Sequence, residues 1–307
     1  MSITHVRTTL TAIASAMIFS GAAHASILDG LVAYYPLDGH AQDLAGGFHG
    51  QVVNGATFGT GKVGQAVQLT QASKQYIGIG SSEPGSDRPI ANFFGSDLST
   101  PTSATDIGPD AYSYSVWFNV TGGSGARYIL ATRNSDPVRA GEQGFTLGAR
   151  VDGNGTLSVF VQLADNPHGT GAYLQRTGMA ITPTDDGWHH LLVTVERGTP
   201  FSVYLDGVLQ TAALQIAGGG AVQFDVDSPL MAVDGLRIGG DQYDNAASSS
   251  RFFHGLIDEL AIWDRVLTPS EIAFLYNNGM GNAIAIPEPM SLMLMGMSGV
   301  LLVRRRR

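Results

Sequence analysis

Two adjacent histidines are the residues that first suggest metal chemistry. His189 and His190 follow Trp188 in the stretch GWHHLLVTVE, residues 187–196. Successive side chains of a strand point to opposite faces, so these two rings could not ligate one metal ion together. We therefore expect a structural role for both histidines beside Trp188.

Carboxylates that could act as an acid and a base occur in IDELAIWD, residues 257–264. A retaining glycosidase needs two carboxyl groups about 5–5.5 Å apart, and alternate residues of a strand share a face. The run offers Asp258, Glu259 and Asp264, but Asp258 and Glu259 are adjacent, so we expect these two to face opposite ways. No Ser-His-Asp arrangement or phosphate-binding loop is evident, so we expect no catalysis.

The segments that must position these residues read as strands. In YSYSVWFNV, residues 112–120, every second side chain is apolar. Asp206-Gly207 is suited to a two-residue hairpin turn because it tolerates positive φ at both positions. The strands predicted from alternation cover residues 112–120, 156–163, 190–198, 201–210, 236–240 and 252–265.

One helix is predicted in the body, in LTPSEIAFLYNNG, residues 267–279. Thr268 and Glu271 form a capping box, Pro269 stands at the first helical position, and Gly279 ends the helix. Residues 81–111, 164–187 and 241–251 are rich in Gly, Ser, Asp, Pro and Asn and read as long loops. Many strands and one short C-terminal helix predict an all-β, antiparallel two-sheet sandwich.

Composition agrees with many strands joined by tight turns. Of 307 residues, 40 are glycine and only 14% are charged. The absence of cysteine excludes disulfides and thiolate metal sites. Residues 26–289 hold all 26 acidic residues but only 12 of the 17 basic ones, a net charge of −14. Such an acidic body is not expected to bind nucleic acid, although it could attract calcium.

The N-terminal 25 residues are typical of a signal peptide. An apolar stretch follows Arg7 and leads to Ala23-His24-Ala25, the small-x-small pattern that signal peptidase reads. We expect cleavage between Ala25 and Ser26, and export of the body. An uncleaved N-terminal anchor is the alternative, which the short stretch rich in Ala, Ser and Thr disfavours.

The C-terminal residues 281–307 combine a Pro-Glu-Pro triplet, an apolar run and a basic end. The run, residues 290–303, is short for a transmembrane helix, which needs about 20 residues. The terminal arginines would lie on the cytoplasmic side of the membrane. A core helix with a basic end is the alternative. The residues of this segment that carry the pattern are Pro287, Glu288, Pro289, Arg304, Arg305, Arg306 and Arg307.

This tail resembles the PEP-CTERM sorting signal of Gram-negative bacteria. The resemblance implies transient inner-membrane insertion through a C-terminal transmembrane helix, followed by processing by an exosortase. The mature protein would reach the cell envelope, the outer surface or the extracellular matrix. The family is associated with exopolysaccharide and biofilm.

The body, residues 26–280, resembles the laminin-G-like, concanavalin A-like jelly roll. Four stretches in family order carry the resemblance: the opening at 31–69, YSYSVWFNV, the Trp-His-His hairpin at 187–210, and HGLIDELAIWDRVLTPSEIAFLYNNG at 254–279. The resemblance implies two sheets of about six or seven antiparallel strands each.

The same resemblance implies a structural calcium ion, with Asp38, Asp43 and Asp258 as ligands. Calcium takes about six to eight oxygens, so carbonyl groups around Gly47 and His49 would have to contribute. The alternative is that Asp38 and Asp43 cap N–H groups in turns, and that Asp258 is a solvent-facing strand residue.

The expected function is therefore that of a non-catalytic domain that binds carbohydrate or serves as an adhesive or structural matrix component. A polysaccharide-active glycoside hydrolase or lyase on the same fold is the alternative. Tyr243, Phe252 and Trp263 are aromatic residues that could contact a sugar, but each is more often a packing residue.

Overall fold

The computed structural model describes residues 27–80, 111–123, 125–131, 144–164, 173–182, 184, 186–196, 199–212, 215–217, 236–240 and 251–286. The chain divides into two compact units, Gly30–Ala283 and a second one made of Met1–Asp29 and Ile284–Arg307. Among the described residues, no helix is both long and apolar enough to span a bilayer. The predicted cleavage site, Pro-Glu-Pro triplet, apolar run and terminal arginines lie outside the described residues.

Within the described part of Gly30–Ala283, one sheet contains eight strands. They run in the order β13-β12-β11-β6-β16-β4-β3, and β1 also pairs with β16. Each pairing in this sheet is antiparallel. The strands are β1 (Leu31–Tyr35), β3 (Thr57–Thr60), β4 (Gln65–Leu69), β6 (Ala111–Val120), β11 (Trp188–Glu196), β12 (Ser202–Leu205), β13 (Val208–Leu209) and β16 (Gly255–Trp263).

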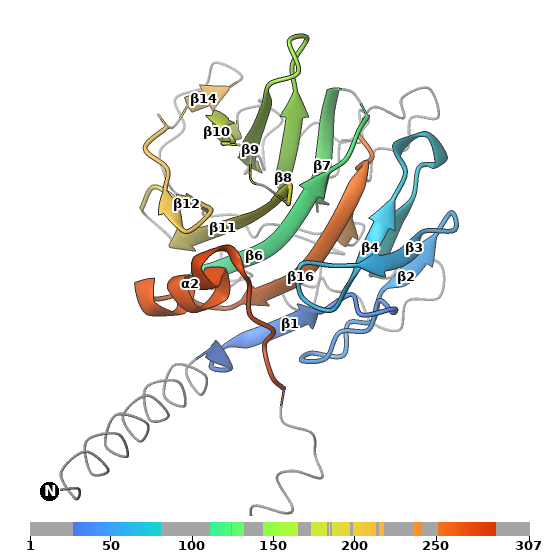
Figure 1. The fold of residues 1–307 in the computed structure, drawn as a ribbon. Helices are drawn as coiled ribbons and strands as arrows, with labels where there is room; N and C mark the ends of the chain where they lie inside the picture. Colours follow the sequence, from blue (N-terminus) through green and yellow to red (C-terminus); the bar gives the residue numbers. More distant parts are fainter. Residues whose placement is uncertain are drawn as a thin grey trace, which may run out of the picture. The chain divides into compact units, whose positions relative to one another are not determined.

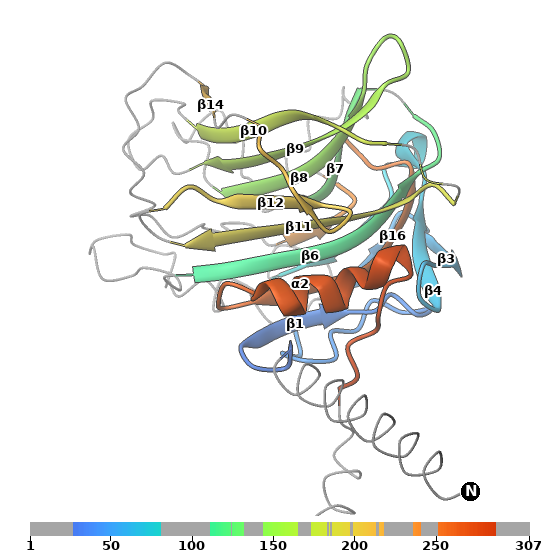
Figure 2. The same cartoon turned by 60° about the vertical axis from the view of Figure 1, so that its left-hand side comes forward.

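The second described sheet also has eight antiparallel strands, in the order β14-β10-β9-β8-β7-β15-β5-β2. Figures 1 and 2 show the two sheets stacked as layers. The prediction of an all-β, two-sheet antiparallel sandwich is confirmed, with more strands per sheet than expected. The strands are β2 (Gln51–Val53), β5 (Tyr76–Ile79), β7 (Gly125–Ala131), β8 (Gly144–Val151), β9 (Leu157–Ala164), β10 (Tyr173–Ala180), β14 (Gln215–Ala217) and β15 (Leu236–Ile238).

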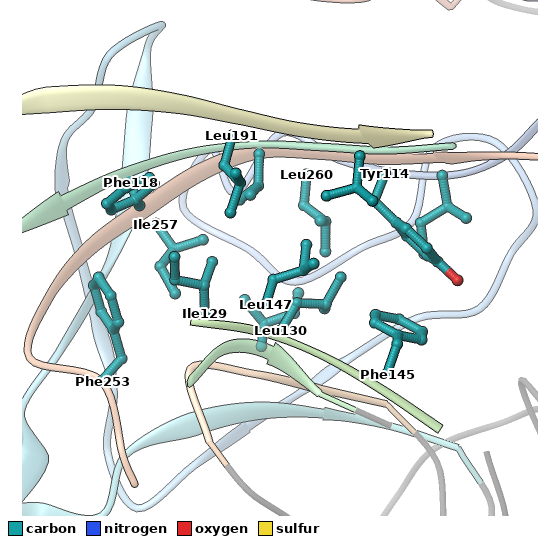
Figure 3. Packing of buried hydrophobic residues seen from close by; sticks show 14 of the residues in the cluster. Tyr114, Phe118, Ile129, Leu130, Phe145, Leu147, Leu191, Phe253, Ile257 and Leu260 are labelled. Carbon is teal, nitrogen blue, oxygen red and sulfur yellow. The ribbon is translucent and has the colours of Figure 1, made fainter. Parts of the chain in front are cut away.

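The core lies between the two sheets and follows from the alternation seen in the sequence. Tyr114 and Phe118 of β6 are fully buried, and the Tyr114 ring lies 4.3 Å from that of Phe145 in the opposite sheet (Figure 3). Removing a large apolar side chain from water contributes roughly 1.5–3 kcal/mol. Many such residues from both sheets form one cluster, so their burial is the main source of stability.

The predicted loop at residues 164–187 is wrong in its central part, because β10 (Tyr173–Ala180) lies there. Its register on β9 shifts between Arg176 and Met179, and Gly178 has a φ of +69°. A bulge of this kind breaks the strict alternation by which strands are found in a sequence. The strand was therefore hidden from an argument based on period alone.

Helix α2 (Pro269–Tyr276) has the predicted capping box. The Thr268 hydroxyl accepts from the Glu271 N–H, and the Glu271 carboxylate accepts from the Thr268 N–H at 2.8 Å. Ile272 and Leu275 are buried. Tyr276 stacks on Trp117 of β6, so the helix covers the outer side of that sheet (Figure 2).

A short 3-10 helix, η1 (Gln71–Ser73), follows β4, and another, η3 (Asn277–Gly279), continues from α2. The Asp206-Gly207 hairpin turn is confirmed, because Leu205 pairs with Val208 and both turn residues have positive φ.

Candidate functional site

Asp43 organises the loop that follows β1. Its Oδ1 accepts from the backbone N–H groups of Tyr34 at 2.8 Å and Ala45 at 2.9 Å. Its Oδ2 accepts from Gly46 at 3.0 Å and Phe48 at 2.9 Å. The side chain is only 3% exposed. These bonds describe a turn residue that caps local N–H groups, the alternative weighed for Asp43 from the sequence.

Asp38 is exposed and makes one such bond. Its Oδ1 accepts from the Gln65 N–H at 2.6 Å. A β-carbon at Gly64, whose φ is +65°, would lie 2.3 Å from that oxygen. The glycine therefore lets the β3–β4 turn approach the carboxylate closely.

Asp258 is wrapped by the β3–β4 turn from almost 200 residues earlier in the chain. Its Oδ2 accepts from the N–H groups of Lys62 at 2.8 Å and Val63 at 3.0 Å. Its Oδ1 accepts from the Glu259 N–H at 2.9 Å. The side chain is fully buried, so the idea of a solvent-facing strand residue is wrong. Burial raises the pKa of Asp258 to about 7, against the three hydrogen bonds, which lower it.

Glu259 stands at a bulge in β16. Its φ is +50°, and the register on β6 shifts between Asp258 and Ala261. Its Oε2 accepts from the Tyr34 hydroxyl at 2.7 Å, while Oε1 is buried and has no hydrogen-bond partner in the described part of the chain. Burial raises the pKa of Glu259 to about 8, and the charge of Asp258 raises it further. Glu259 therefore holds a proton at neutral pH.

The expectation that Asp258 and Glu259 face opposite ways assumed a regular strand. The bulge interrupts that alternation, and both side chains are buried. The Tyr34 contact and the Lys62 and Val63 contacts come from distant segments, and no spacing in the sequence signals them.

The three predicted calcium ligands do not offer a shared set of free oxygens in this arrangement. Asp43 and Asp258 direct their oxygens at N–H groups, whereas calcium needs about six to eight oxygen ligands with available lone pairs. In the parts of the chain that the structure describes, no group of three or more His, Asp or Glu side chains is placed to hold a metal ion. The calcium site at Asp38, Asp43 and Asp258 stays a prediction.

The two histidines contact different partners on the two sides of β11. His189 places its Nδ1 2.9 Å from Asp206 Oδ2 and its ring 5.7 Å from that of Phe118. His190 lies 4.9 Å from the ring of Trp117, on the helix-covered side. Each of the two rings therefore has an aromatic residue of β6 as a neighbour.

His190 also contacts a serine, a pair that sequence reasoning missed. Its Nε2 lies 2.8 Å from Ser115 Oγ. Burial lowers the pKa of His190 to about 4, which keeps the ring neutral. Its Nδ1 has no hydrogen-bond partner among the described residues, and Asp206 Oδ1 accepts from the His190 backbone N–H instead. In a Ser-His-Asp triad an acid orients the histidine through its Nδ1, and no described residue does so here.

The signal for this pair was present in the alternation of β6. Ser115 and Trp117 occupy the same face of YSYSVWFNV, and in the structure β11 sets His190 directly opposite Trp117. The register between the two strands, which the sequence does not state, brings the rings together. Lys62 Nζ lies 5.0 Å from the centroid of the Trp117 ring and 2.6 Å from Asp186 Oδ2. The lysine therefore adds a cation–π contact and an ion pair beside the Trp117 ring.

Two of the three candidate sugar-contacting aromatics are packing residues. Phe252 is 3% exposed and Trp263 is fully buried, as the packing alternative expected. Tyr243 lies outside the described residues.

The sequence and the fold are both similar to those of known proteins. The sequence profile of the concanavalin A-like lectin/glucanases superfamily, in its laminin-G form, matches residues 94–273, more than half of the chain. The chain belongs to the concanavalin A-like lectin/glucanase superfamily. The matched span includes three of the four stretches that carry the resemblance in the sequence, the last of them up to residue 273, and leaves out the opening at 31–69. No curated protein matches the chain.

Several solved structures are similar to this chain. Domain 4 of a GH43 extracellular arabinanase from Geobacillus stearothermophilus, solved with arabinotriose, has a TM-score of 0.49 at 19% identity, covering 82% of this chain and 98% of that one. The binding domain of Paraclostridial Mosquitocidal Protein 1 has a TM-score of 0.49 at 16% identity, covering 82% and 53%. The CBM40 of the Ruminococcus gnavus IT-sialidase, bound to sialyllactose, has a TM-score of 0.41 at 16% identity, covering 53% and 81%.

Proposed function

We propose that this protein is an exported, non-catalytic carbohydrate-binding domain. An exosortase system would sort it to the cell envelope or extracellular matrix, where it binds polysaccharide or serves as an adhesive or structural component. Membership of the lectin/glucanase superfamily supports the carbohydrate part, and the residue patterns at the two chain ends support the export part.

One observation carries the non-catalytic part of the proposal. Asp258 and Glu259, the acidic pair of the closing strand, are 0% and 5% exposed. Their oxygens accept from backbone N–H groups and from the Tyr34 hydroxyl. A glycosidase acid and base must reach the scissile bond and an attacking water, and these two carboxyl groups are not accessible to either.

A glycan array tests the proposal. A polypeptide of residues 26–289 is applied with calcium and again with EDTA, and we expect binding to at least one polysaccharide class. The bound glycans are then incubated with the protein and assayed for new reducing ends. Binding to no glycan would overturn carbohydrate recognition in favour of a purely structural role, and release of reducing ends would overturn the non-catalytic assignment.

A further inference from the structure

Arg127 of β7 is a buried arginine that has no counter-charge among the described residues. Its side chain is 0% exposed, and Nε, Nη1 and Nη2 all lack a hydrogen-bond partner among the described residues. In the sheet it stands directly opposite Ala149, a member of the core cluster. Directly opposite residues point to the same face, so Arg127 points into the sandwich from near the end of the strand.

Three loops meet around the guanidinium. A β-carbon placed on Gly123 would lie 2.8 Å from Arg127 Nε, 2.7 Å from Gln71 Oε1 and 3.0 Å from His254 Cβ. Gly123 has a φ of +81° and is exposed, and His254 is half-buried. The guanidinium therefore lies directly beneath a surface turn that only glycine allows to come so close.

This arrangement is costly unless an anion completes it. A buried charge without a partner loses its hydration and recovers nothing from hydrogen bonds. Burial lowers the pKa of Arg127, but an arginine stays protonated at physiological pH. The planar guanidinium fork matches a carboxylate through two parallel N–H···O bonds. A carboxylate reaching under the Gly122–Gly123 turn would therefore supply the missing partner.

We propose that Arg127 is the anion-binding residue of a carboxylate site at this end of the sandwich, and that the carboxylate belongs to a uronic acid of a bound polysaccharide. The site rests on the burial and missing partner of Arg127, whereas the choice of a glycan rests on the proposed function. One buried cation reads a single carboxylate. Residues 26–289 carry a net charge of −14, so we do not expect a broad basic surface that binds polyanions.

The test compares two matched trisaccharides on the full chain, trigalacturonate and galactotriose, by calorimetry and by their effect on Tm. We expect trigalacturonate to bind about 10- to 100-fold more tightly, the range for one charge-assisted hydrogen-bonded contact. Arg127→Met removes the charge and keeps much of the volume. It should lose that preference without a lower Tm, because no partner is left unpaired. Arg150→Met, an exposed arginine on the adjacent strand β8, is the matched control and should change neither result.

The possible results of this test distinguish a failure of the Arg127 site from a failure of the proposed carbohydrate-binding function. Equal binding of both sugars, unaffected by Arg127→Met, would leave carbohydrate binding standing and overturn the site. Stabilisation by acetate but not by trigalacturonate, lost in Arg127→Met, would overturn the glycan as the source of the carboxylate. A lower Tm in Arg127→Met, with no effect of trigalacturonate on the native chain, would make Arg127 a structural residue. Binding of neither sugar, together with an empty glycan array, would overturn the proposed function itself.

Discussion

Glu259 shows how one side chain can link stability to pH. Its pKa of about 8 in the folded protein lies above the ordinary value of 4.5, because the carboxyl group is buried against Tyr34 and beside Asp258. Between these two pH values the folded state holds a proton that the unfolded state has released. The free energy of unfolding must therefore fall as pH rises from about 4.5 to about 8. Asp258, with a pKa of about 7, acts in the same direction.

Glu259→Gln should weaken this dependence. The amide keeps the shape of the protonated acid and can still accept from the Tyr34 hydroxyl, but it never ionises. We expect the variant to resemble the native chain near pH 5 and to be more stable at pH 9 by on the order of a few kcal/mol. Urea unfolding at both values in calcium-free buffer measures the difference. An equal gap between the two proteins at pH 5 and pH 9 would contradict the assignment.

The Ser115–His190 pair is a second case in which burial sets a pKa, here by lowering it. A serine and a histidine 2.8 Å apart can suggest catalysis, but burial lowers the pKa of this ring to about 4, which makes it a weak base at neutral pH. The rings of Trp117 and Tyr276 lie 4.9 Å and 6.1 Å from it and hold it between sheet and helix. The pair thus belongs to the packing of α2 on β6 and β11.

At the scale of elements, the loop after β1 is tied to its strand by one carboxylate. The four N–H groups that Asp43 satisfies come from both the strand and the loop. The register of β1 on β16 also shifts between Leu31 and Ala33, so the pairing of these two strands is irregular at the start of β1. The conformation of the loop therefore depends on the cap.

Asp43→Asn discriminates between a cap and a calcium ligand. Asparagine has one acceptor oxygen, so N–H groups facing the amide nitrogen lose their partner, at a cost of about 1–3 kcal/mol each. For a cap, the loss of stability should be the same in EDTA and in calcium. For a calcium ligand, the native chain should melt at a higher temperature with calcium, and the variant should not. Asp38→Asn, which affects one exposed bond, is the control, and calorimetry in both buffers is the measurement.

At the scale of the whole molecule, the segments predicted to direct export are the first and last stretches of the sequence, and the sandwich is formed by residues between them in the chain. The body carries a strong negative charge, whereas four of the basic residues of the chain form its last four positions. This separation of charge is what the positive-inside rule would use to hold the tail in a membrane.

Neutral replacements of Arg304 to Arg307 should therefore disturb sorting. We expect the variant to accumulate in a different fraction from the native chain when cells are separated into inner membrane, outer membrane and medium. Replacing the exposed Arg150 with glutamine leaves the tail intact and serves as the control. An unchanged distribution of the tail variant would show that the arginines are not part of a sorting signal.

Local signals in the sequence were enough for seven of the sixteen described strands and for helix α2. Alternation in residues 112–120 predicts β6, Asp206-Gly207 predicts its hairpin, and Thr268 with Glu271 predicts the start of α2, because each depends only on residues that are near one another. Strand β10 escaped this argument, because its bulge at Gly178 breaks the alternation.

The candidate site was decided by tertiary structure. The family resemblance implied Asp38, Asp43 and Asp258 as ligands, but their hydrogen-bond partners and burial depend on which distant segments pack against them. Tyr34 reaches Glu259 across 225 positions of the chain, and Lys62 reaches Asp258 across 196. That Arg127 has no partner among the described residues is likewise visible only in the folded chain. Sequence determines what each residue can do locally, whereas burial and charge, which set its pKa and its available bonds, are properties of the folded neighbourhood.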